Sequence, residues 1–171
     1  KRDFSYQISD AFAVFIDPFN DQTNGFSFAV NPLGVQREGL LQGGGGMGVT
    51  ESWDNKWFSK VTCNKDGYVV EMAIPFKSIR YNDDITTWGI NFSRNDLQRN
   101  ENSSWAAVPR NFNIATMAFT GKLNWDNPPK KAGANVSIIP YGIAGIKQDF
   151  ELDSTYAQLN AGLDAKIAVT S

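Results

Sequence analysis

The chain has 171 residues, of which 42% are hydrophobic, and its 16 basic and 18 acidic side chains leave a formal net charge of −2. This balance does not favour the phosphate contacts that dominate nucleic-acid affinity, so no nucleic acid is expected as a partner. The absence of histidine excludes Ser-His and Cys-His nucleophile activation and zinc sites built on imidazole. The single cysteine, Cys63, cannot form an internal disulfide, and because it lies in a strand-like segment we expect it to be buried.

Two short runs of aromatic and β-branched residues, 11–17 and 26–30, predict the first two strands. The residues between them end in Asn24-Gly25, a pair that tolerates positive φ, so we expect a hairpin that turns there. A third strand is predicted over 35–41. The four consecutive glycines within 42–48 then indicate a mobile loop, because the Gly-Lys-Ser/Thr of a phosphate-binding loop is absent.

Further short β segments follow at even spacing, each bounded by Gly, Pro, Asn or Asp; they cover residues 57–62, 68–74, 88–94, 104–108 and 115–123. Only Pro75 to Ile79 suggests a helical turn, with proline at its first position. No alternation of strands with long helices occurs. The pattern predicts an all-β fold, an antiparallel β-sandwich or barrel.

The character of the chain changes at a stretch rich in proline, lysine and glycine, which we assign as a linker over residues 128–135. Beyond it, residues 157–169 alternate strictly between apolar and polar, with 136–146 as a hairpin partner across the acidic loop 149–153. A run of this length exceeds the roughly 5–6 residues of a typical soluble strand. It matches a strand that crosses a bilayer, although a long hairpin of an ordinary soluble sheet has the same pattern.

Seven short motifs occur in order between residues 14 and 106. They are Val14 to Asp21, Asn24-Gly25-Phe26, Val30 to Gln36, Trp53 to Trp57, Glu71 to Phe76, Trp88 to Phe92 and Trp105-Ala106. In this order and spacing they resemble the family 9 carbohydrate-binding module-like domain found at the front of large outer-membrane β-barrel proteins of unknown function. The tail, with Ile138 to Tyr141 and Gly162 to Ser171, looks like the entry into that barrel.

The resemblance implies a two-part organisation. Residues 1–127 would form a carbohydrate-binding-module-like β-sandwich, truncated at its N-terminal side, and residues 136–171 the first strands of a membrane-type β-barrel. It also implies a location in the Gram-negative cell envelope, at the outer membrane, with the module periplasmic or surface-exposed. The expected partners are a poly- or oligosaccharide and, through the C-terminal β-unit, outer-membrane lipid.

Sugar recognition needs flat aromatic faces together with planar polar side chains that bind hydroxyl groups. The candidate aromatic residues are Trp53, Trp57 and Trp105, each of which has packing within the sandwich as its alternative role. The candidate polar residues are Asn91, Arg94 and Arg110, for which a solvated surface position is the alternative. Trp88 shares a strand face with Ile90 and Phe92, so it is assigned to the core.

One cluster in the first hairpin carries oxygen ligands of the kind that calcium takes; it comprises Asp17, Asn20, Asp21 and Asn24. The spacing is not that of an EF-hand, and hydrogen bonding within the turn accounts for the same residues. No cofactor is required, and structural calcium is kept as a hypothesis.

The function expected from these residues is non-catalytic carbohydrate binding. The first alternative is a structural or transport accessory of the outer membrane that binds no sugar. The second is a glycoside hydrolase with paired carboxylates, for which Asp17, Glu38, Glu51, Asp54 and Glu71 are available. Nothing in the sequence pairs these carboxylates, so an enzyme is not favoured.

Overall fold

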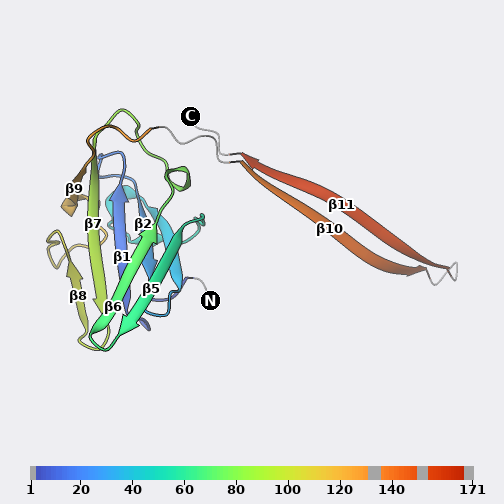
Figure 1. Ribbon diagram of the computed structural model, residues 1–171, viewed down its shortest axis with the longest axis horizontal. Coiled ribbons are helices and arrows are strands. Elements are labelled where there is room, and N and C mark those ends of the chain that lie inside the picture. Colours follow the sequence, from blue (N-terminus) through green and yellow to red (C-terminus); the bar gives the residue numbers. More distant parts are fainter. Residues whose placement is uncertain (1–2, 131–135, 150–153, 168–171) are drawn as a thin grey trace. The chain divides into compact units, whose positions relative to one another are not determined.

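The computed structural model describes residues 3–130, 136–149 and 154–167. They belong to two units, Lys1–Lys131 and Ala132–Ser171 (Figure 1). Every strand pair in the described residues is antiparallel. The all-β, antiparallel class predicted from the sequence is therefore confirmed.

Helix is almost absent from the described residues. It is limited to three single turns of 3-10 helix, Gly43–Gly45 (η1), Phe76–Ser78 (η2) and Met117–Phe119 (η3). The second of these follows Pro75, as the sequence predicted for residues 75–79. In the part of the chain that the structure describes, no helix is long and apolar enough to cross a membrane.

The first unit is organised around a seven-stranded sheet with the order β4-β3-β2-β1-β7-β8, in which β9 also pairs with β7. Its strands are Ala11–Asp17 (β1), Gly25–Val30 (β2), Gln36–Leu41 (β3), Val49–Thr50 (β4), Thr87–Asp96 (β7), Glu101–Ser104 (β8) and Gly121–Asn124 (β9). β1 lies between β2 and β7, and all of its residues except Phe12 are buried. A strand that is apolar on both faces is suited to this central position.

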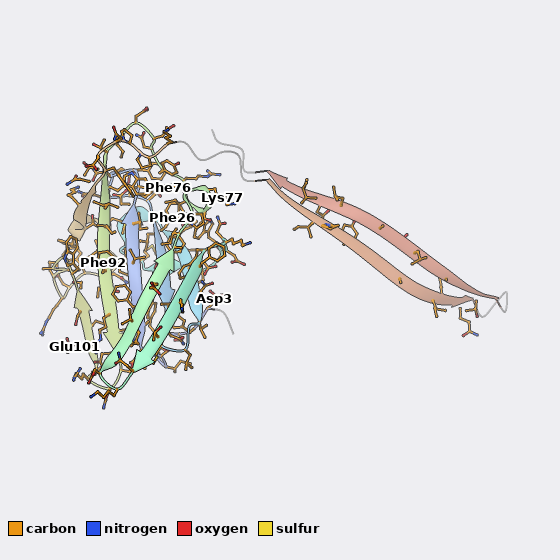
Figure 2. All side chains as sticks on the ribbon, in the orientation of Figure 1. Asp3, Phe26, Phe76, Lys77, Phe92 and Glu101 are labelled. Carbon is orange, nitrogen blue, oxygen red and sulfur yellow. The ribbon has the colours of Figure 1, made fainter. Side chains whose placement is uncertain are left out.

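One face of the sheet is covered by the hairpin of Phe58–Asn64 (β5) and Gly67–Ala73 (β6), as Figure 1 shows. Val14, Phe28 and Trp88 from the sheet pack with Trp57, while Val61 and Val70 of the hairpin pack against this cluster. Phe26, on the same face, is labelled in Figure 2. Fully burying an aliphatic or aromatic side chain stabilises a fold by about 1.5–3 kcal/mol, and this layer has the larger cluster of such side chains, so it is the principal core. Because a hairpin packs on a sheet here, the arrangement is sandwich-like.

The opposite face is covered by irregular segments rather than by strands. Phe15, Ala29 and Leu41 from the sheet pack with Ala115 and Met117, at and just before η3. Two aromatic residues of the N-terminal segment, Phe4 and Tyr6, complete this layer. The central sheet of the first unit is thus buried on both faces.

The first hairpin turns at different residues from those predicted. Positive φ occurs at Asn20 (52°) and Gln22 (60°), not at Asn24 or Gly25. Gly25 instead begins β2, where a Cβ atom would lie 2.6 Å from the backbone oxygen of Ile16 and 2.7 Å from the sulfur of Met117. Glycine is required at this position for close packing rather than for the turn.

The glycine run contains the turn η1, in which Gly44 N–H donates to Thr23 O at 2.8 Å and a Cβ on Gly45 would lie 2.2 Å from Ala115 O. That this loop is mobile stays a prediction. One other local expectation needs correction. Cys63 is exposed rather than buried, with its thiol 3.3 Å from Pro32 O, because it lies near the end of the hairpin strand.

The second unit is a single antiparallel hairpin of Val136–Asp149 (β10) and Ser154–Ile167 (β11). Over residues 138–146 of β10, the register places only small or apolar residues on one face, in the pairs Ile138↔Ala165, Pro140↔Leu163, Gly142↔Ala161, Ala144↔Leu159 and Ile146↔Ala157. These side chains are not buried, as the 60% exposure of Ile138 and 81% of Leu159 show.

Residues 150–153 of the predicted acidic loop, and Ala168 and Val169 of the alternating run, lie outside the described residues. That this hairpin opens a membrane unit, and that the sandwich lacks upstream strands, stay predictions.

Candidate functional site

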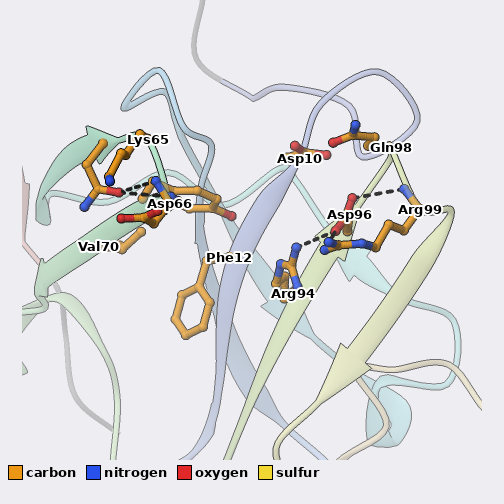
Figure 3. Close-up of a pocket in the computed structure, with 12 residues that line it drawn as sticks. Asp10, Phe12, Lys65, Asp66, Val70, Arg94, Asp96, Gln98 and Arg99 are labelled. Atoms are coloured by element: carbon orange, nitrogen blue, oxygen red, sulfur yellow. Dashed lines mark hydrogen bonds and ion pairs between the residues drawn. The ribbon is translucent and has the colours of Figure 1, made fainter.

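A cleft of about 820 Å³ lies between the tip of the β5–β6 hairpin and one end of β1 and β7 (Figure 3). The hairpin contributes Lys65, Asp66, Tyr68 and Val70, and the sheet side contributes Asp10, Phe12, Arg94, Asp96 and Arg99. The sheet residues come together because β1 and β7 are paired, with Phe12 opposite Arg94. Tyr68 and Val70 reach the cleft because they are two residues apart on β6 and therefore both lie on its inner, half-buried face.

The charged side chains of the cleft balance. Its acidic residues are Asp10, Asp66 and Asp96, and its basic residues are Lys65, Arg94 and Arg99. A site with three charges of each sign offers hydrogen-bond donors and acceptors without a net charge that would select an ionic ligand.

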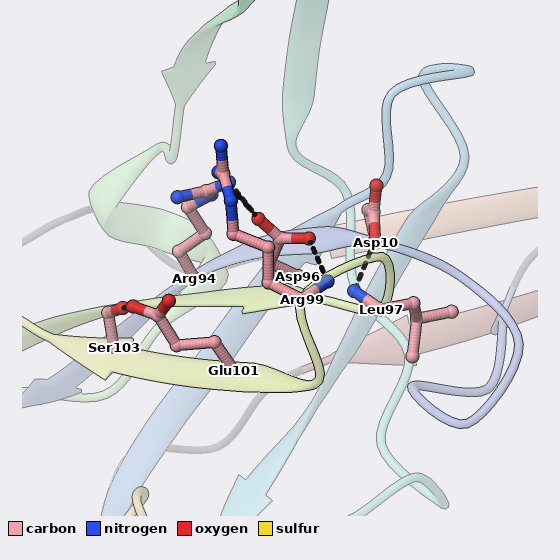
Figure 4. A network of polar contacts seen from close by, with 7 residues as sticks. All are labelled: Asp10, Arg94, Asp96, Leu97, Arg99, Glu101 and Ser103. Carbon is pink, nitrogen blue, oxygen red and sulfur yellow. Dashed lines mark hydrogen bonds and ion pairs between the residues drawn. The ribbon is translucent and has the colours of Figure 1, made fainter.

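Asp96 holds the two arginines of this cleft in place (Figure 4). Its carboxylate forms ion pairs with Arg94 and, at 3.3 Å, with Arg99, and it also accepts the backbone N–H of Arg99 at 3.1 Å. The N–H of Arg99 is the largest cause that lowers the pKa of Asp96 below its usual 3.8, and the two guanidinium groups act in the same direction. Asp96 therefore stays ionised and the arginine side chains stay oriented.

Tyr68 supplies a polar atom that the described residues leave unsatisfied. Its hydroxyl oxygen is buried and has no hydrogen-bond partner there. Burial first, and then the carboxylate of Asp10, raises the pKa of Tyr68 above 10.0, so the phenol remains protonated near neutral pH. A neutral phenol both donates and accepts a hydrogen bond, as a sugar hydroxyl also does.

Of the six predicted ligand residues, Arg94 lines this cleft. Its side chain is 46% exposed, and the ion pair with Asp96 engages one of its nitrogens, Nη2. Trp105 lies outside the cleft lining but is 62% exposed, and its ring contacts Phe92 with a centroid separation of 5.9 Å. These two residues are presented on the same face of the β7–β8 pair.

The structure places the other two tryptophans in the core. Trp57 is 3% exposed, and its indole N–H donates to the buried carboxylate of Glu38 at 3.0 Å. Trp53 is half-buried, with its ring 5.1 Å from that of Phe26 and 5.8 Å from that of Phe28. Both tryptophans therefore pack within the first unit, which is the alternative role stated for them.

The remaining polar candidates do not line the cleft either. Asn91 is 1% exposed; its amide donates to Ala106 O at 3.1 Å and accepts from Ala106 N–H at 2.9 Å. It therefore anchors the segment after β8 to β7. Arg110 is exposed on the connection between β8 and η3.

Three of the four predicted calcium ligands, Asp17, Asn20 and Asp21, act as hydrogen-bond acceptors in the first hairpin turn, and the backbone N–H of the fourth, Asn24, is a donor there. Asp17 is fully buried and accepts the N–H groups of Phe19 at 3.2 Å and Gln22 at 2.8 Å. Asp21 accepts from Thr23 and Asn24, and Asn20 accepts from Lys122 at 2.6 Å. The described part of the chain holds no group of three or more His, Cys, Asp or Glu residues placed to bind a metal. These residues fit the turn better than they fit an ion, and calcium stays a hypothesis.

None of the carboxylates considered for glycoside hydrolysis lines the cleft. Asp17 belongs to the turn, Glu38 binds Trp57, and Glu51 forms an ion pair with Arg37. Asp54 and Glu71 are exposed elsewhere on the first unit.

Sequence reasoning missed Asp10, Tyr68, Asp96 and Arg99. Arg94 and Asp96 carried a usable signal, because residues two apart on a strand share a face and this pair has opposite charges. Tyr68 carried a weaker one, since it alternates with Val70 and Met72. Asp10 gave none, because only the pairing of β1 with β7 brings it to the cleft.

The family model described as carbohydrate family 9 binding domain-like matches residues 4–130. This range contains every residue of the cleft. No curated protein and no solved structure matches the chain.

Proposed function

The chain belongs to the carbohydrate family 9 binding domain-like family, and from that premise we propose that its first unit binds a carbohydrate in the cleft between β6 and β7. The aromatic rings of Phe12 and Tyr68 offer surfaces for the C–H faces of a sugar. Arg94 offers a planar group that binds neighbouring hydroxyls. Binding rather than catalysis is the role that these groups support.

The unpaired hydroxyl of Tyr68 is the observation that carries this proposal. A buried polar atom without a partner costs a fold about 1–3 kcal/mol. Of the six such atoms in the described residues, the hydroxyl of Tyr68 is the one whose residue lines the cleft. Tyr68 lines the cleft while its hydroxyl oxygen is closed to solvent, so a sugar hydroxyl would provide the missing hydrogen bond once the side chains around that oxygen move aside. The charge balance of the cleft favours such an uncharged polar ligand over an anion.

The test is a comparison of the full chain with Tyr68→Phe and Arg94→Ala, using a glycan array followed by calorimetry on the glycans that bind. Each change should weaken binding roughly tenfold, because each removes about one hydrogen bond to the ligand. Arg110→Ala is the matched control, since it removes an exposed arginine outside the cleft. If no glycan binds, or if Arg110→Ala weakens binding as much as Arg94→Ala, the proposal fails.

We also propose that the second unit is a membrane β-unit, located at the outer membrane of a Gram-negative cell with lipid against its apolar face. The supporting observation is the cross-strand register, which places small or apolar residues opposite one another in five successive pairs. From Ile138 to Ile146 this face spans nine residues of β10, within the roughly 9–11 that a tilted strand needs to cross a bilayer. The first unit would then be periplasmic or surface-exposed.

Two neighbouring residues of β11 test this second proposal in the full-length protein. Leu163, on the apolar face, and Asp164, on the other face, are both described and lie side by side in the register. Leu163→Arg should block outer-membrane assembly, because an arginine facing lipid near the midplane costs about 2–4 kcal/mol. Asp164→Asn should be tolerated. Equal tolerance of both, measured by heat-modifiability on gels, would show that the hairpin serves a soluble structural role.

A further inference from the structure

A row of aromatic rings connects the cleft with an exposed tryptophan on the same sheet. Phe12 lines the cleft, its ring stacks on Phe92 with centroids 6.1 Å apart, and Phe92 contacts Trp105. These rings form a continuous aromatic row from the cleft toward the β7–β8 side of the sheet, where Phe92 and Glu101 are labelled in Figure 2. A ligand that enters the cleft therefore meets more aromatic surface beyond it.

The strand register turns a second row of side chains toward the same space. Ser103 lies opposite Arg94 and Glu101 opposite Asp96, while Trp105 N–H donates to Phe92 O at 2.9 Å. Residues opposite one another in an antiparallel pair point to the same face of the sheet. Ser103 and Glu101 are thus on the face that carries Arg94 and Asp96 (Figure 4). Trp105, two residues after Ser103, lies on this face as well.

Trp105 is held in place although it is exposed. The six-membered part of its ring occupies the space above Gly121, where a Cβ atom would lie 2.2 Å from Trp105 Cζ3. The buried amide of Asn91 fixes the next residue, Ala106, through two hydrogen bonds. An indole that is fixed on one side and 62% exposed is a preorganised surface for stacking.

From these observations we infer that the ligand is an extended, uncharged oligosaccharide chain that runs along β7 and β8. One sugar occupies the cleft against Tyr68 and Arg94, and a later sugar of the same chain stacks on Trp105. The inference rests on the proposed function of the cleft and adds to it the direction, the minimum length and the charge of the ligand.

The length of the path supports a chain rather than a single sugar. Arg94 and Ile90 are four residues apart on β7, and Ile90 pairs with Gly121, over which the Trp105 ring lies. Four residues correspond to about 13 Å at the usual rise of a strand. That distance exceeds one pyranose ring. Because the cleft contains equal numbers of acidic and basic side chains, it also offers no excess positive charge to a chain of uronic acids.

Calorimetry with oligosaccharides of increasing length tests the inference on the full chain. The probes are β-1,4-linked oligomers of glucose, xylose and mannose from one to five units, with oligogalacturonate as the anionic comparison. For at least one neutral series, affinity should rise about five- to tenfold from the monosaccharide to the trisaccharide and then level off.

Three variants separate the cleft from the tryptophan. Trp105→Ala should abolish the gain with length while leaving the monosaccharide affinity unchanged, and Trp105→Phe should restore part of the gain. Tyr68→Phe should weaken binding at every length. Phe58→Ala, which removes a 54% exposed aromatic ring on β5 that does not line the cleft, should change neither quantity.

The possible failures are distinguishable. If no oligomer of any length binds, the proposed function itself is overturned. If oligomers bind with affinity independent of length, or if Trp105→Ala weakens the monosaccharide as much as the trisaccharide, the cleft binds sugar but the extended path is wrong. If oligogalacturonate binds more tightly than every neutral series, the uncharged ligand is wrong.

Discussion

The β1–β2 pair and the β10–β11 pair are both antiparallel, yet they differ in what covers them. β10 and β11 are in register over fourteen residue pairs, against five for β1 and β2. All residues of β2 are buried, whereas Ile146 and Leu159 of the longer hairpin are each 81% exposed. Ladder hydrogen bonds replace bonds to water and contribute little net free energy, while burial of apolar surface contributes more. The extent of strand pairing is therefore a poor guide to the stability of the two units.

The largest effect is expected from Phe28→Ala in the first unit. Phe28 is fully buried against Trp53 and Trp57, so its truncation should lower the free energy of unfolding by about 3–5 kcal/mol. Urea titration followed by tryptophan fluorescence measures this, because all five tryptophans lie between residues 53 and 125.

The matched change in the second unit is Ile143→Ala, at a side chain that is 60% exposed. It should shift the unfolding free energy by less than about 0.5 kcal/mol. Hydrogen exchange resolved by peptide should show faster exchange throughout the first unit in Phe28→Ala and little change in β10 and β11. Similar shifts for the two variants would contradict the contrast in burial.

The next largest effect should be a loss of folding stability at alkaline pH. It involves Tyr6, which packs on the face of the sheet that irregular segments cover. Burial is the main cause that raises the pKa of Tyr6 to about 12, and the nearby Glu51 raises it further against the opposing effect of Arg37. The unfolded chain loses this phenol proton near pH 10 and the folded chain near pH 12. Stability that is present below pH 10 should therefore fall by about 2–3 kcal/mol as the pH rises to 12.

Tyr6→Phe should remove that part of the alkaline loss, and urea midpoints between pH 9 and 12 measure it. Tyr141→Phe, at a half-exposed tyrosine of the second unit, is the control and should leave the profile unchanged. An alkaline loss in Tyr6→Phe as large as in the unchanged chain would rule out Tyr6 as its cause.

A smaller effect than the alkaline one is expected at acid pH, at the polar end of the sheet. The pKa of Asp96 is lowered, mainly by the N–H of Arg99, so its contribution to stability is present above pH 3.8 and is lost as the pH falls through the lower folded value. Asp96→Asn should flatten the decline of the urea midpoint below about pH 4. Asp164→Asn in the second unit should not. A decline that persists in Asp96→Asn would assign acid sensitivity to other carboxylates.

The strands of the core were predictable because their residues carry the period and the turn signals of strands. β1, β3, β6 and β7 lie within about two residues of the predicted ranges. The polar edge strand β8, at Glu101–Ser104, was placed too late in the chain, since it has no apolar pattern and pairs only through its backbone. A strand was predicted over residues 115–123, but it begins only at Gly121, and before it Ala115 and Met117 are buried from an irregular segment.

The site was less predictable than the fold because its burial is set by non-local partners. Trp57 and Trp105 each adjoin polar residues in the sequence. Trp57 is nevertheless buried against Phe28, and its indole N–H is satisfied by Glu38, which the pairing of β2 with β3 places opposite Phe28. Trp105 stays 62% exposed. The cleft likewise joins Asp10, Tyr68 and Asp96 from three separate strands or strand ends, a meeting that no local pattern encodes.

The two-stranded sheet of the second unit also has two outer edges. Each of β10 and β11 pairs with the other along one edge, and along the opposite edge no strand of the described residues adds to the ladder. Such edges present rows of backbone donors and acceptors that accept another strand. A strand added at either edge would satisfy these groups and also extend the apolar face. A strand from a second copy of the chain would have the same effect. Self-association that increases with concentration is therefore the behaviour that these unpaired edges favour.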